Sequence, residues 1–131
     1  MRHSLPFLSI ALIMLLNLPA SAHHSFGATY SVDKTITLKG KIAQVTLRSP
    51  HSFFYVDVDN SGKSERWAIE GTGAGQFAQS GIDRNSFKIG DAVEIVGNPA
   101  RDRDSNRARL VRITRTTDGL TWGNRPGETV D

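Results

Sequence analysis

The sequence contains no cysteine, and both of its methionines, Met1 and Met14, lie in the first 22 residues. Disulfides, thiolate zinc sites and iron–sulfur clusters need cysteine, and thioether copper sites need methionine. The chain beyond residue 22 can therefore form none of these centres. Aromatic residues are also few, at 8%, whereas all 12 glycines lie beyond residue 22. This composition favours short strands and tight turns over a helical bundle.

The chain has one long apolar run, and it lies at the start. Met1-Arg2-His3 is positively charged, Leu5 to Leu18 is almost entirely apolar, and Ala20-Ser21-Ala22 follows. The apolar run is shorter than the roughly 20 residues of a membrane span, and the small-x-small step fits a signal-peptide cleavage site. We predict that residues 1–22 are a signal peptide. The mature protein would be periplasmic or secreted and would have no membrane span.

Alternating apolar residues predict five strands between residues 35 and 118. Three strands are expected within 35–70, a short helix over 76–79, and two more strands around Val93 and Val111. The apolar positions change phase near Ala43-Gln44, which indicates a β-bulge in the first strand. Turns are expected at 59–62, at 88–91 and at Asp118-Gly119, and Gly81 is expected to end the helix in a left-handed conformation.

Three strands, a helix and two strands follow the order of an OB-type barrel. The sequence therefore predicts an all-β fold with one short helix, namely a small OB-like five-stranded antiparallel barrel over residues 35–118. Residues 23–34 would form an N-terminal arm and residues 119–131 a C-terminal tail.

The strongest candidate for a binding site is a set of three histidines, His23, His24 and His51. Cleavage after Ala22 would make His23 the N-terminal residue, whose α-amine and imidazole can chelate copper(II) together. His24 and His51 would complete the site if the arm folds back. Cleavage after Ala20 would instead place a histidine third, which also suits copper(II). The competing interpretation is a solvated N-terminus and a structural His51. Copper(II) is the cofactor that the histidines favour, and the chelate formed after cleavage at Ala20 would suit copper or nickel.

Two other groups of residues are candidate binding surfaces. Phe53, Tyr55 and Trp67 would form an aromatic face for a small ligand or an unidentified protein partner, and Arg107, Arg109 and Arg112 would bind an anion. Charges of both signs between 101 and 109 favour solvation as the alternative for the arginines. Export argues against nucleic acid as a partner.

Other motifs are incomplete, and they indicate no catalytic residues. The acidic segment beginning at Asp57 lacks the glutamate of a calcium loop, since residue 68 is alanine, and the glycines at 71–75 lack the next glycine of a dinucleotide site, since residue 76 is glutamine. No serine lies in a nucleophile motif, so an enzyme is unsupported.

Several short segments occur together in a familiar order: His23-His24-Ser25-Phe26, residues 37–42, Pro50-His51-Ser52, residues 67–71, 88–91 and 97–100. In this the chain resembles a small exported bacterial family, the domain-of-unknown-function family 6152 (DUF6152). The resemblance implies an exported β-barrel-like protein in which the paired histidines and the Pro-His step recur. It implies no activity. Ser49 stands where such proteins more usually carry asparagine.

Together these observations predict an exported, non-enzymatic binding module that holds copper(II) through its N-terminal histidines. An envelope interaction or scaffold protein using the aromatic face is the alternative. A metalloenzyme with oxidative chemistry at the histidines is a weaker third.

Overall fold

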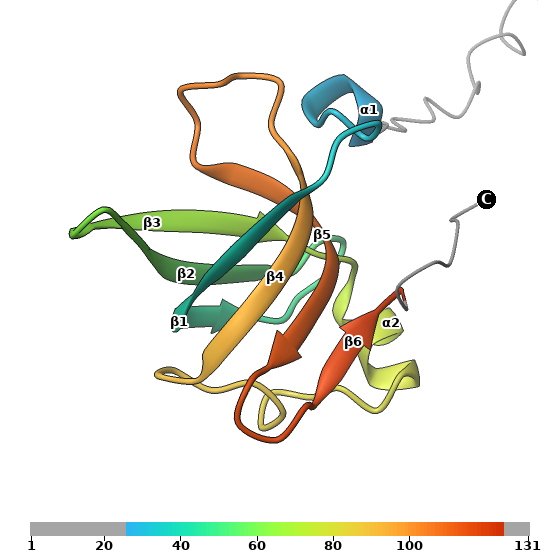
Figure 1. Cartoon of the computed structure of the whole chain (residues 1–131). Helices are drawn as coiled ribbons and strands as arrows, with labels where there is room; N and C mark the ends of the chain where they lie inside the picture. Colours follow the sequence, from blue (N-terminus) through green and yellow to red (C-terminus); the bar gives the residue numbers. More distant parts are fainter. Residues whose placement is uncertain (1–25, 125–131) are drawn as a thin grey trace, which may run out of the picture.

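The computed structural model describes residues 26–124 as six strands and two short helices (Figure 1). In chain order these are α1 (Phe26–Thr29), β1 (Ile36–Thr46), β2 (Phe53–Asn60), β3 (Lys63–Glu70), α2 (Ala74–Gln79), β4 (Ala92–Pro99), β5 (Arg107–Arg115) and β6 (Thr121–Gly123). The predicted signal peptide, His23 and His24 lie outside the described residues. Within residues 26–124 neither helix has the length and apolar character needed to cross a membrane.

The strands form one sheet in the order β3-β2-β1-β4-β5-β6, and an additional pairing of β3 with β5 closes the first five into a barrel. This confirms the predicted all-β barrel with only short helices. The barrel is not wholly antiparallel, as we had expected, because residues 68–70 of β3 pair in parallel with residues 107–109 of β5. The reason is geometric: in a closed ring of five strands, directions cannot alternate at every junction.

Strand β1 belongs to both halves of the barrel. Gly40 pairs with Val58 of β2 on one side and with Val93 of β4 on the other. A Cβ atom at residue 40 would lie 2.3 Å from the carbonyl oxygen of Asp57, so glycine allows this close approach of backbones. The register with β2 shifts between Ile42 and Gln44, which confirms the predicted bulge and bends the strand there.

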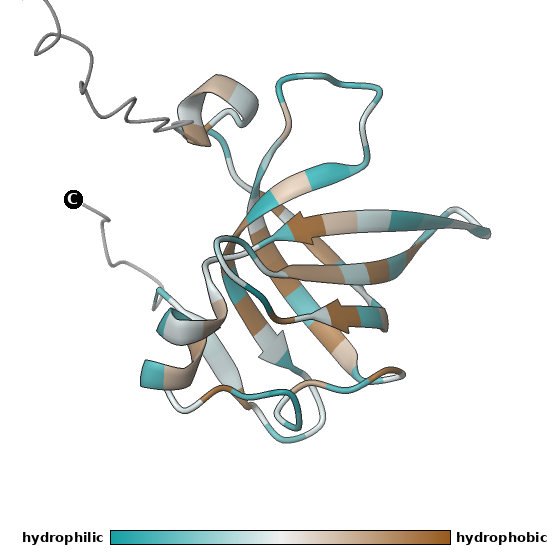
Figure 2. Ribbon diagram, turned by 180° about the vertical axis from the view of Figure 1, so that it is seen from behind, coloured by the Kyte–Doolittle hydropathy of each residue, from teal (hydrophilic) through white to brown (hydrophobic). Residues whose placement is uncertain are grey.

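The core lies inside the barrel and extends under α2. Alternate positions of β2, of β4 and of the first half of β5 supply buried side chains, whereas β1 and β3 supply one buried apolar residue each, Ile42 and Ile69. Figure 2 shows this alternation as brown and pale or teal segments along the strands. Phe77 of α2 packs edge-on against Phe54, with ring centroids 5.8 Å apart. Gly81, with φ of +77°, follows the helix in the expected left-handed conformation.

The sheet continues past residue 118, where we had placed the start of the C-terminal tail. Gly119 has φ of +76° in the predicted turn, and Thr121–Gly123 then pair with β5 as β6. The ring of Trp122 lies 4.5 Å from that of Phe77, so this short strand covers part of the core.

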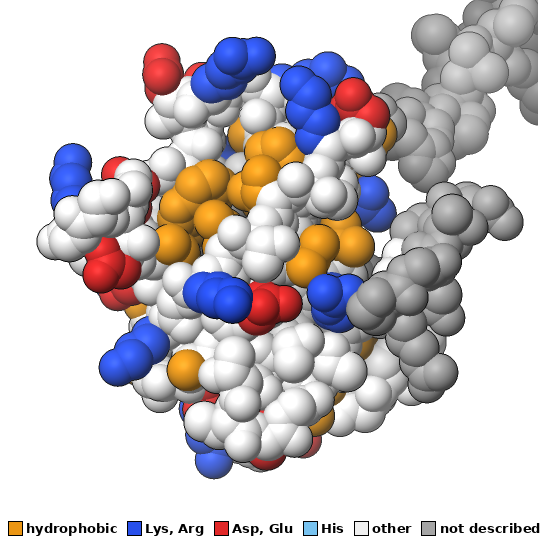
Figure 3. All heavy atoms as spheres, in the orientation of Figure 1, with side chains coloured by type: hydrophobic (Ala, Val, Ile, Leu, Met, Phe, Trp, Pro, Cys, Tyr) orange, Lys and Arg blue, Asp and Glu red, His pale blue; other side chains and the backbone are white. Residues whose placement is uncertain are grey.

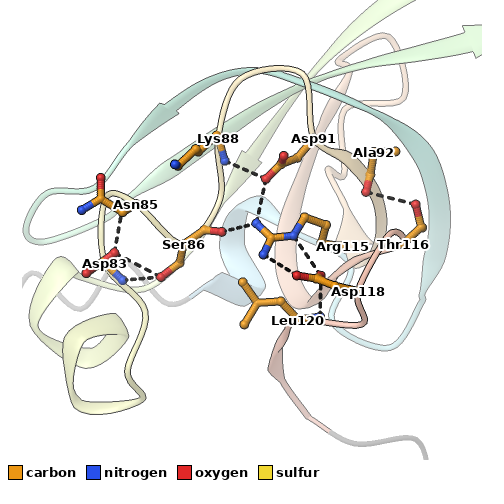
Figure 4. Close-up of polar contacts among 10 residues, drawn as sticks. All are labelled: Asp83, Asn85, Ser86, Lys88, Asp91, Ala92, Arg115, Thr116, Asp118 and Leu120. Carbon is orange, nitrogen blue, oxygen red and sulfur yellow. Dashed lines mark hydrogen bonds and ion pairs between the residues drawn. The ribbon is translucent and has the colours of Figure 1, made fainter.

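Arg115 links three segments at the end of the barrel opposite α1 (Figure 4). Its Nη1 lies 3.0 Å from Oδ2 of Asp91 and donates to the carbonyl oxygen of Ser86, while its Nη2 lies 2.7 Å from Oδ2 of Asp118. The guanidinium therefore ties the loop before β4 to the turn between β5 and β6.

Candidate functional site at the arm–barrel junction

A buried carboxylate, Glu70, is the centre of a polar cluster at the junction between the arm and the barrel. Glu70 is the last residue of β3 and is 8% exposed. The hydroxyl of Tyr30 donates to its Oε2, Arg107 Nη2 lies 3.3 Å from the same oxygen, and His51 Nδ1 lies 2.5 Å from Oε1. The three donors come from the arm, from β5 and from the β1–β2 loop. Because both oxygens are paired, the carboxylate remains satisfied although it is buried.

Tyr30 attaches the arm to the barrel. Its side chain is 1% exposed, and its backbone forms a bridge with Ala100 after β4. On either side, Ser31 N donates to the Pro99 oxygen at 2.9 Å and Arg101 N donates to the Thr29 oxygen at 3.0 Å. Burial first, and then the hydrogen bond to Glu70, raise the pKa of Tyr30 far above its ordinary value. The phenol therefore stays protonated and serves as a donor to Glu70.

His51 lies on a loop that is fixed to the segment after β3. The Ser49–Pro50 peptide bond is cis, and Ser52, directly after the histidine, is fully buried. Ser52 N donates to the Thr72 oxygen at 3.0 Å, and Gly71 N donates to the Ser52 oxygen at 2.8 Å. These bonds bring His51 beside Glu70, although the two residues lie on different elements.

One nitrogen of the His51 ring, Nδ1, contacts Glu70, whereas the other, Nε2, does not. Nδ1 faces Glu70, and 38% of the side chain is exposed. In the neutral imidazole, a proton on Nδ1 that is shared with a carboxylate leaves the lone pair on Nε2. This is the tautomer that a metal-binding histidine needs.

Phe26 covers the His51 ring from the arm. The two rings are stacked, with centroids 5.3 Å apart and planes inclined by 26°. Arg109 of β5 lies on Phe26 as well, with its Cζ 4.5 Å from the ring centroid. The first described residue of the arm is therefore held directly against His51.

The predicted arginine group is divided between two places. Arg107 and Arg109 both lie at the junction, where they contact Glu70 and Phe26. Arg112 instead lies near the described end of the chain, with Nη1 3.5 Å from the oxygen of Asn124. The register shift between β4 and β5 places one extra residue, Val111, between the part of β5 that carries Arg107 and Arg109 and the part that carries Arg112. The structure does not gather the three into one anion site.

The predicted aromatic face is also divided. Phe53 and Tyr55 stack on one face of β2, with centroids 6.2 Å apart. Trp67 pairs in register with Val56, a buried residue on the other face of β2, and packs against the core. Directly opposite residues in a sheet point to the same face, so Trp67 cannot join Phe53 and Tyr55.

Sequence analysis missed Tyr30 and Glu70, the two residues at the centre of the junction. They are 40 positions apart, and neither lies in a motif that predicts their contact. Within residues 26–124, no three histidine, aspartate or glutamate side chains are grouped so that they could hold a metal. A metal site that uses His51 and two further side chains of these kinds would need at least one donor from outside that range.

The structure defines a class: a small OB-like barrel whose N-terminal arm is joined to the closing strands through a buried carboxylate. The chain belongs to the family of unknown function DUF6152, whose model matches residues 11–109. The family identified from the short motifs is thus confirmed. No curated protein matches the sequence.

Among solved structures, the chain is similar to parts of two larger ones. The crystal structure of TiaS in complex with an isoleucine tRNA and ATP aligns with a TM-score of 0.46 and 18% identity, covering 63% of this chain and 18% of that one. The ZRD-deleted mutant of TiaS in complex with agmatine aligns with a TM-score of 0.44 and 18% identity, covering 69% and 26%. The chain thus spans about a quarter or less of the length of these two proteins.

Proposed function

We propose that this protein is an exported, non-enzymatic module that binds copper(II) between its N-terminal arm and the barrel. The α-amine and imidazole of His23, together with His24, supply nitrogen donors from the arm. His51 supplies Nε2 from the barrel. Nitrogen donors of this kind suit the tetragonal geometry of copper(II).

The stack of Phe26 on His51 is the observation that carries the proposal. His24 precedes Phe26 by two residues, so their Cα atoms can be at most about 7 Å apart. His23 adds one further residue of reach. The chain between Phe26 and the two histidines is therefore short enough to keep both histidines near the His51 ring.

Glu70 supports the proposal by its contact with Nδ1 of His51. A carboxylate in this position fixes the ring orientation of a metal-binding histidine and makes its other nitrogen more basic. Arg107 and Tyr30 hold that carboxylate in turn. The barrel thus supplies an oriented ligand, whereas the arm supplies the chelating terminus.

Copper(II) titration of the processed protein tests the proposal. The protein exported by its own leader is purified, its N-terminus is checked by intact mass, and binding is followed by calorimetry and electron paramagnetic resonance. We expect one copper(II) with several nitrogen ligands. His23→Gln/His24→Gln should abolish this site, and His51→Gln should weaken binding about tenfold or more.

Two controls identify the ligands. Acetylating the α-amine of His23 removes that nitrogen from the chelate and neither adds a residue nor changes the histidine side chains, so affinity should fall. Glu65→Gln changes a carboxylate on β3 that contacts only Asn60 among the described residues and should leave binding unchanged. A correctly processed protein that retains no copper(II), or one whose affinity is indifferent to His51, would disprove the site.

A second candidate function, an envelope interaction or scaffold module, is favoured by the stacked Phe53–Tyr55 pair on the outer face of β2. Replacing Tyr55 with a photo-crosslinking amino acid in cells would give one discrete adduct if a partner binds this face. The same label at Thr37, an exposed position of β1, is the control. Equal labelling at both positions would refute a specific surface.

A further inference from the structure

A pocket lies at the end of the short ladder between β3 and β5. The parallel pairing of these strands ends at Ala68 and Arg107, and the residue before it on β3 is Trp67. Here a pocket of about 250 Å³ has Trp67, Pro99 and Ala100 as its apolar residues. The loop between β4 and β5 and the residues just before β1 form its rim. Glu70 and its three partners do not line it, although the backbone segments that attach the arm at residues 31 and 99–101 do.

The rim is rich in positive charge. Lys34, Arg101 and Arg103 all line the pocket and are exposed, and none of them forms an ion pair within residues 26–124. Arg101 is oriented by a bond from its Nε to the oxygen of Gly27, 2.7 Å away. Three cations around one small pocket favour an anionic group in it.

The pocket also has an apolar wall and groups that bond hydroxyls. Trp67 is only partly buried, and a patch of apolar side chains is visible below the charged β4–β5 loop in Figure 3. Ser31 and Ser105 add hydroxyls to the lining, and Asp102 adds one carboxylate acceptor. A tryptophan face packs against flat apolar surfaces, and its neighbours here can bond several hydroxyls.

We propose that this pocket binds an acidic sugar unit of an oligosaccharide, a uronate. Its ring packs on Trp67, its carboxylate lies among Lys34, Arg101 and Arg103, and its hydroxyls bond the serines and Asp102. Barrels of this type include oligosaccharide binders. The volume suits a single ring, being below the range of most drug-sized sites.

The same features distinguish a uronate from an oligonucleotide. Proteins that bind single strands stack successive bases on several aromatic rings along a basic groove. Here Trp67 is the one aromatic residue of the pocket, since Phe53 and Tyr55 lie on the other face of the sheet.

Titration of the full mature protein, freed of metal by a chelator, with tri-galacturonate tests the proposal independently of copper. The two tryptophan side-chain resonances, assigned with Trp67→Phe, are followed by NMR. We expect saturable shifts of the Trp67 indole and of the amides of 100–105, and none for neutral maltotriose. Arg103→Glu should weaken binding about tenfold or more at low salt.

Arg84→Glu is the matched control, because it makes the same charge change on an exposed residue at a different pocket. It should leave the affinity for tri-galacturonate within about twofold. The proposal is overturned if the Trp67 indole does not shift, if maltotriose or a thymidine trinucleotide binds as well as tri-galacturonate, or if Arg84→Glu weakens binding as much as Arg103→Glu. Well-dispersed spectra establish that each variant is folded.

Discussion

Glu70 shows how a single side chain can join distant parts of a chain. It receives hydrogen bonds from residues 40 positions before it and 37 positions after it, and the loop of His51 adds a third partner. A buried carboxylate is costly unless its charge is met, and here two oxygens meet three donors. The arm, the β1–β2 loop and the closing strands are therefore held by one charge.

Replacing Glu70 with glutamine removes that charge and keeps the shape. We expect Glu70→Gln to lower the free energy of unfolding by about 2–3 kcal/mol, because Arg107 and Tyr30 lose a charged acceptor in a largely buried place. Urea denaturation followed by circular dichroism measures this. Glu65→Gln, on the same strand but in solvent contact, should change stability by less than about 0.5 kcal/mol. Equal effects would show that the junction contributes nothing special.

Asp118 predicts a particular acid sensitivity. Hydrogen bonds from Arg115 first, and then from the Leu120 amide, lower the pKa of Asp118 to about 2, while the Lys88 amide and Arg115 lower the pKa of Asp91. A carboxylate whose pKa is lower in the folded state stabilises the fold above its unfolded pKa of about 4. That stability is lost as the pH falls towards 2.

Asp118→Asn should therefore be less stable than the natural protein at pH 7, and the difference should shrink between pH 4 and pH 2. Urea midpoints at several pH values in this range give the result. Asp33→Asn alters an exposed carboxylate that has no arginine partner among the described residues and serves as control. A difference that stays constant down to pH 2 would contradict the role of Arg115.

Sequence reasoning named one residue of the junction, His51, and missed others for a physical reason. His51 was predicted because a histidine after proline beside a strand is a local feature. Tyr30 and Glu70 were not, since their contact depends on how the barrel closes. The same closure determines that Trp67 faces away from Phe53 and Tyr55, which residue type alone does not reveal.

Among the elements, β1 and α2 each contain a glycine whose replacement by alanine should change stability in opposite directions. A Cβ at Gly40 would meet the Asp57 oxygen at 2.3 Å and Val56 Cγ1 at 2.8 Å, so Gly40→Ala must displace backbone. We expect it to cost about 3 kcal/mol. Gly75 in α2 has nothing within 4 Å of such an atom, and Gly75→Ala should stabilise by about 0.5–1 kcal/mol. Thermal and urea unfolding compare the two variants.

The test is whether each variant raises or lowers the free energy of unfolding. A mild Gly40→Ala would mean that β1 and β2 can separate without loss, contrary to the role of Gly40 as the point where β1 serves both halves. A destabilising Gly75→Ala would mean that α2 needs glycine for a contact that residues 26–124 do not show.

Elements defined by local chemistry were predicted well. The turn at Ser61-Gly62 has φ of 54° and 85°, the Gly90 and Gly119 turns have positive φ, and the bulge lies where the apolar phase changes. Strand β6 was missed because three residues are too short for an alternation to be recognised. Its stability comes from Trp122 against Phe77 and from pairing with β5, both long-range contacts.

For the whole molecule, the barrel closes through its shortest ladder. Three residue pairs join β3 to β5, whereas eight join β2 to β3. We expect the barrel to open first at this seam, because few hydrogen bonds have to break there. Native-state hydrogen exchange should find the Ala68 amide, bonded to the Asn106 oxygen at 2.9 Å, less protected than the amides of β4, which has neighbours on both sides.

If Ala68 exchanges as slowly as β4, the seam opens only with global unfolding. Glu70→Gln should lower the protection of Ala68 more than that of β4, because Glu70 and Arg107 link the two strands directly across this seam. A uniform loss across the sheet would contradict local opening.

The order of strands and helix was enough to predict the barrel, since few topologies accommodate three strands, a helix and two strands. Which pair closes it, and in which direction, was not predicted from local pattern. The parallel seam is a property of the ring as a whole. Tyr30 of the arm contacts Glu70 and Arg107 at this seam, so the place where the arm attaches follows from where the seam lies.

Because Phe26 contacts His51, the number of residues before Phe26 limits how far the N-terminal amine can lie from His51. With Phe26 held in place, removal of residues 1–22 leaves residues 23–25 before it, and removal of residues 1–20 leaves residues 21–25. Each extra residue can shift the terminal amine by up to about 3.5 Å. If the proposed signal peptide is removed, the position of the cut would decide which atoms reach His51, so two forms with identical folds would differ in chemistry.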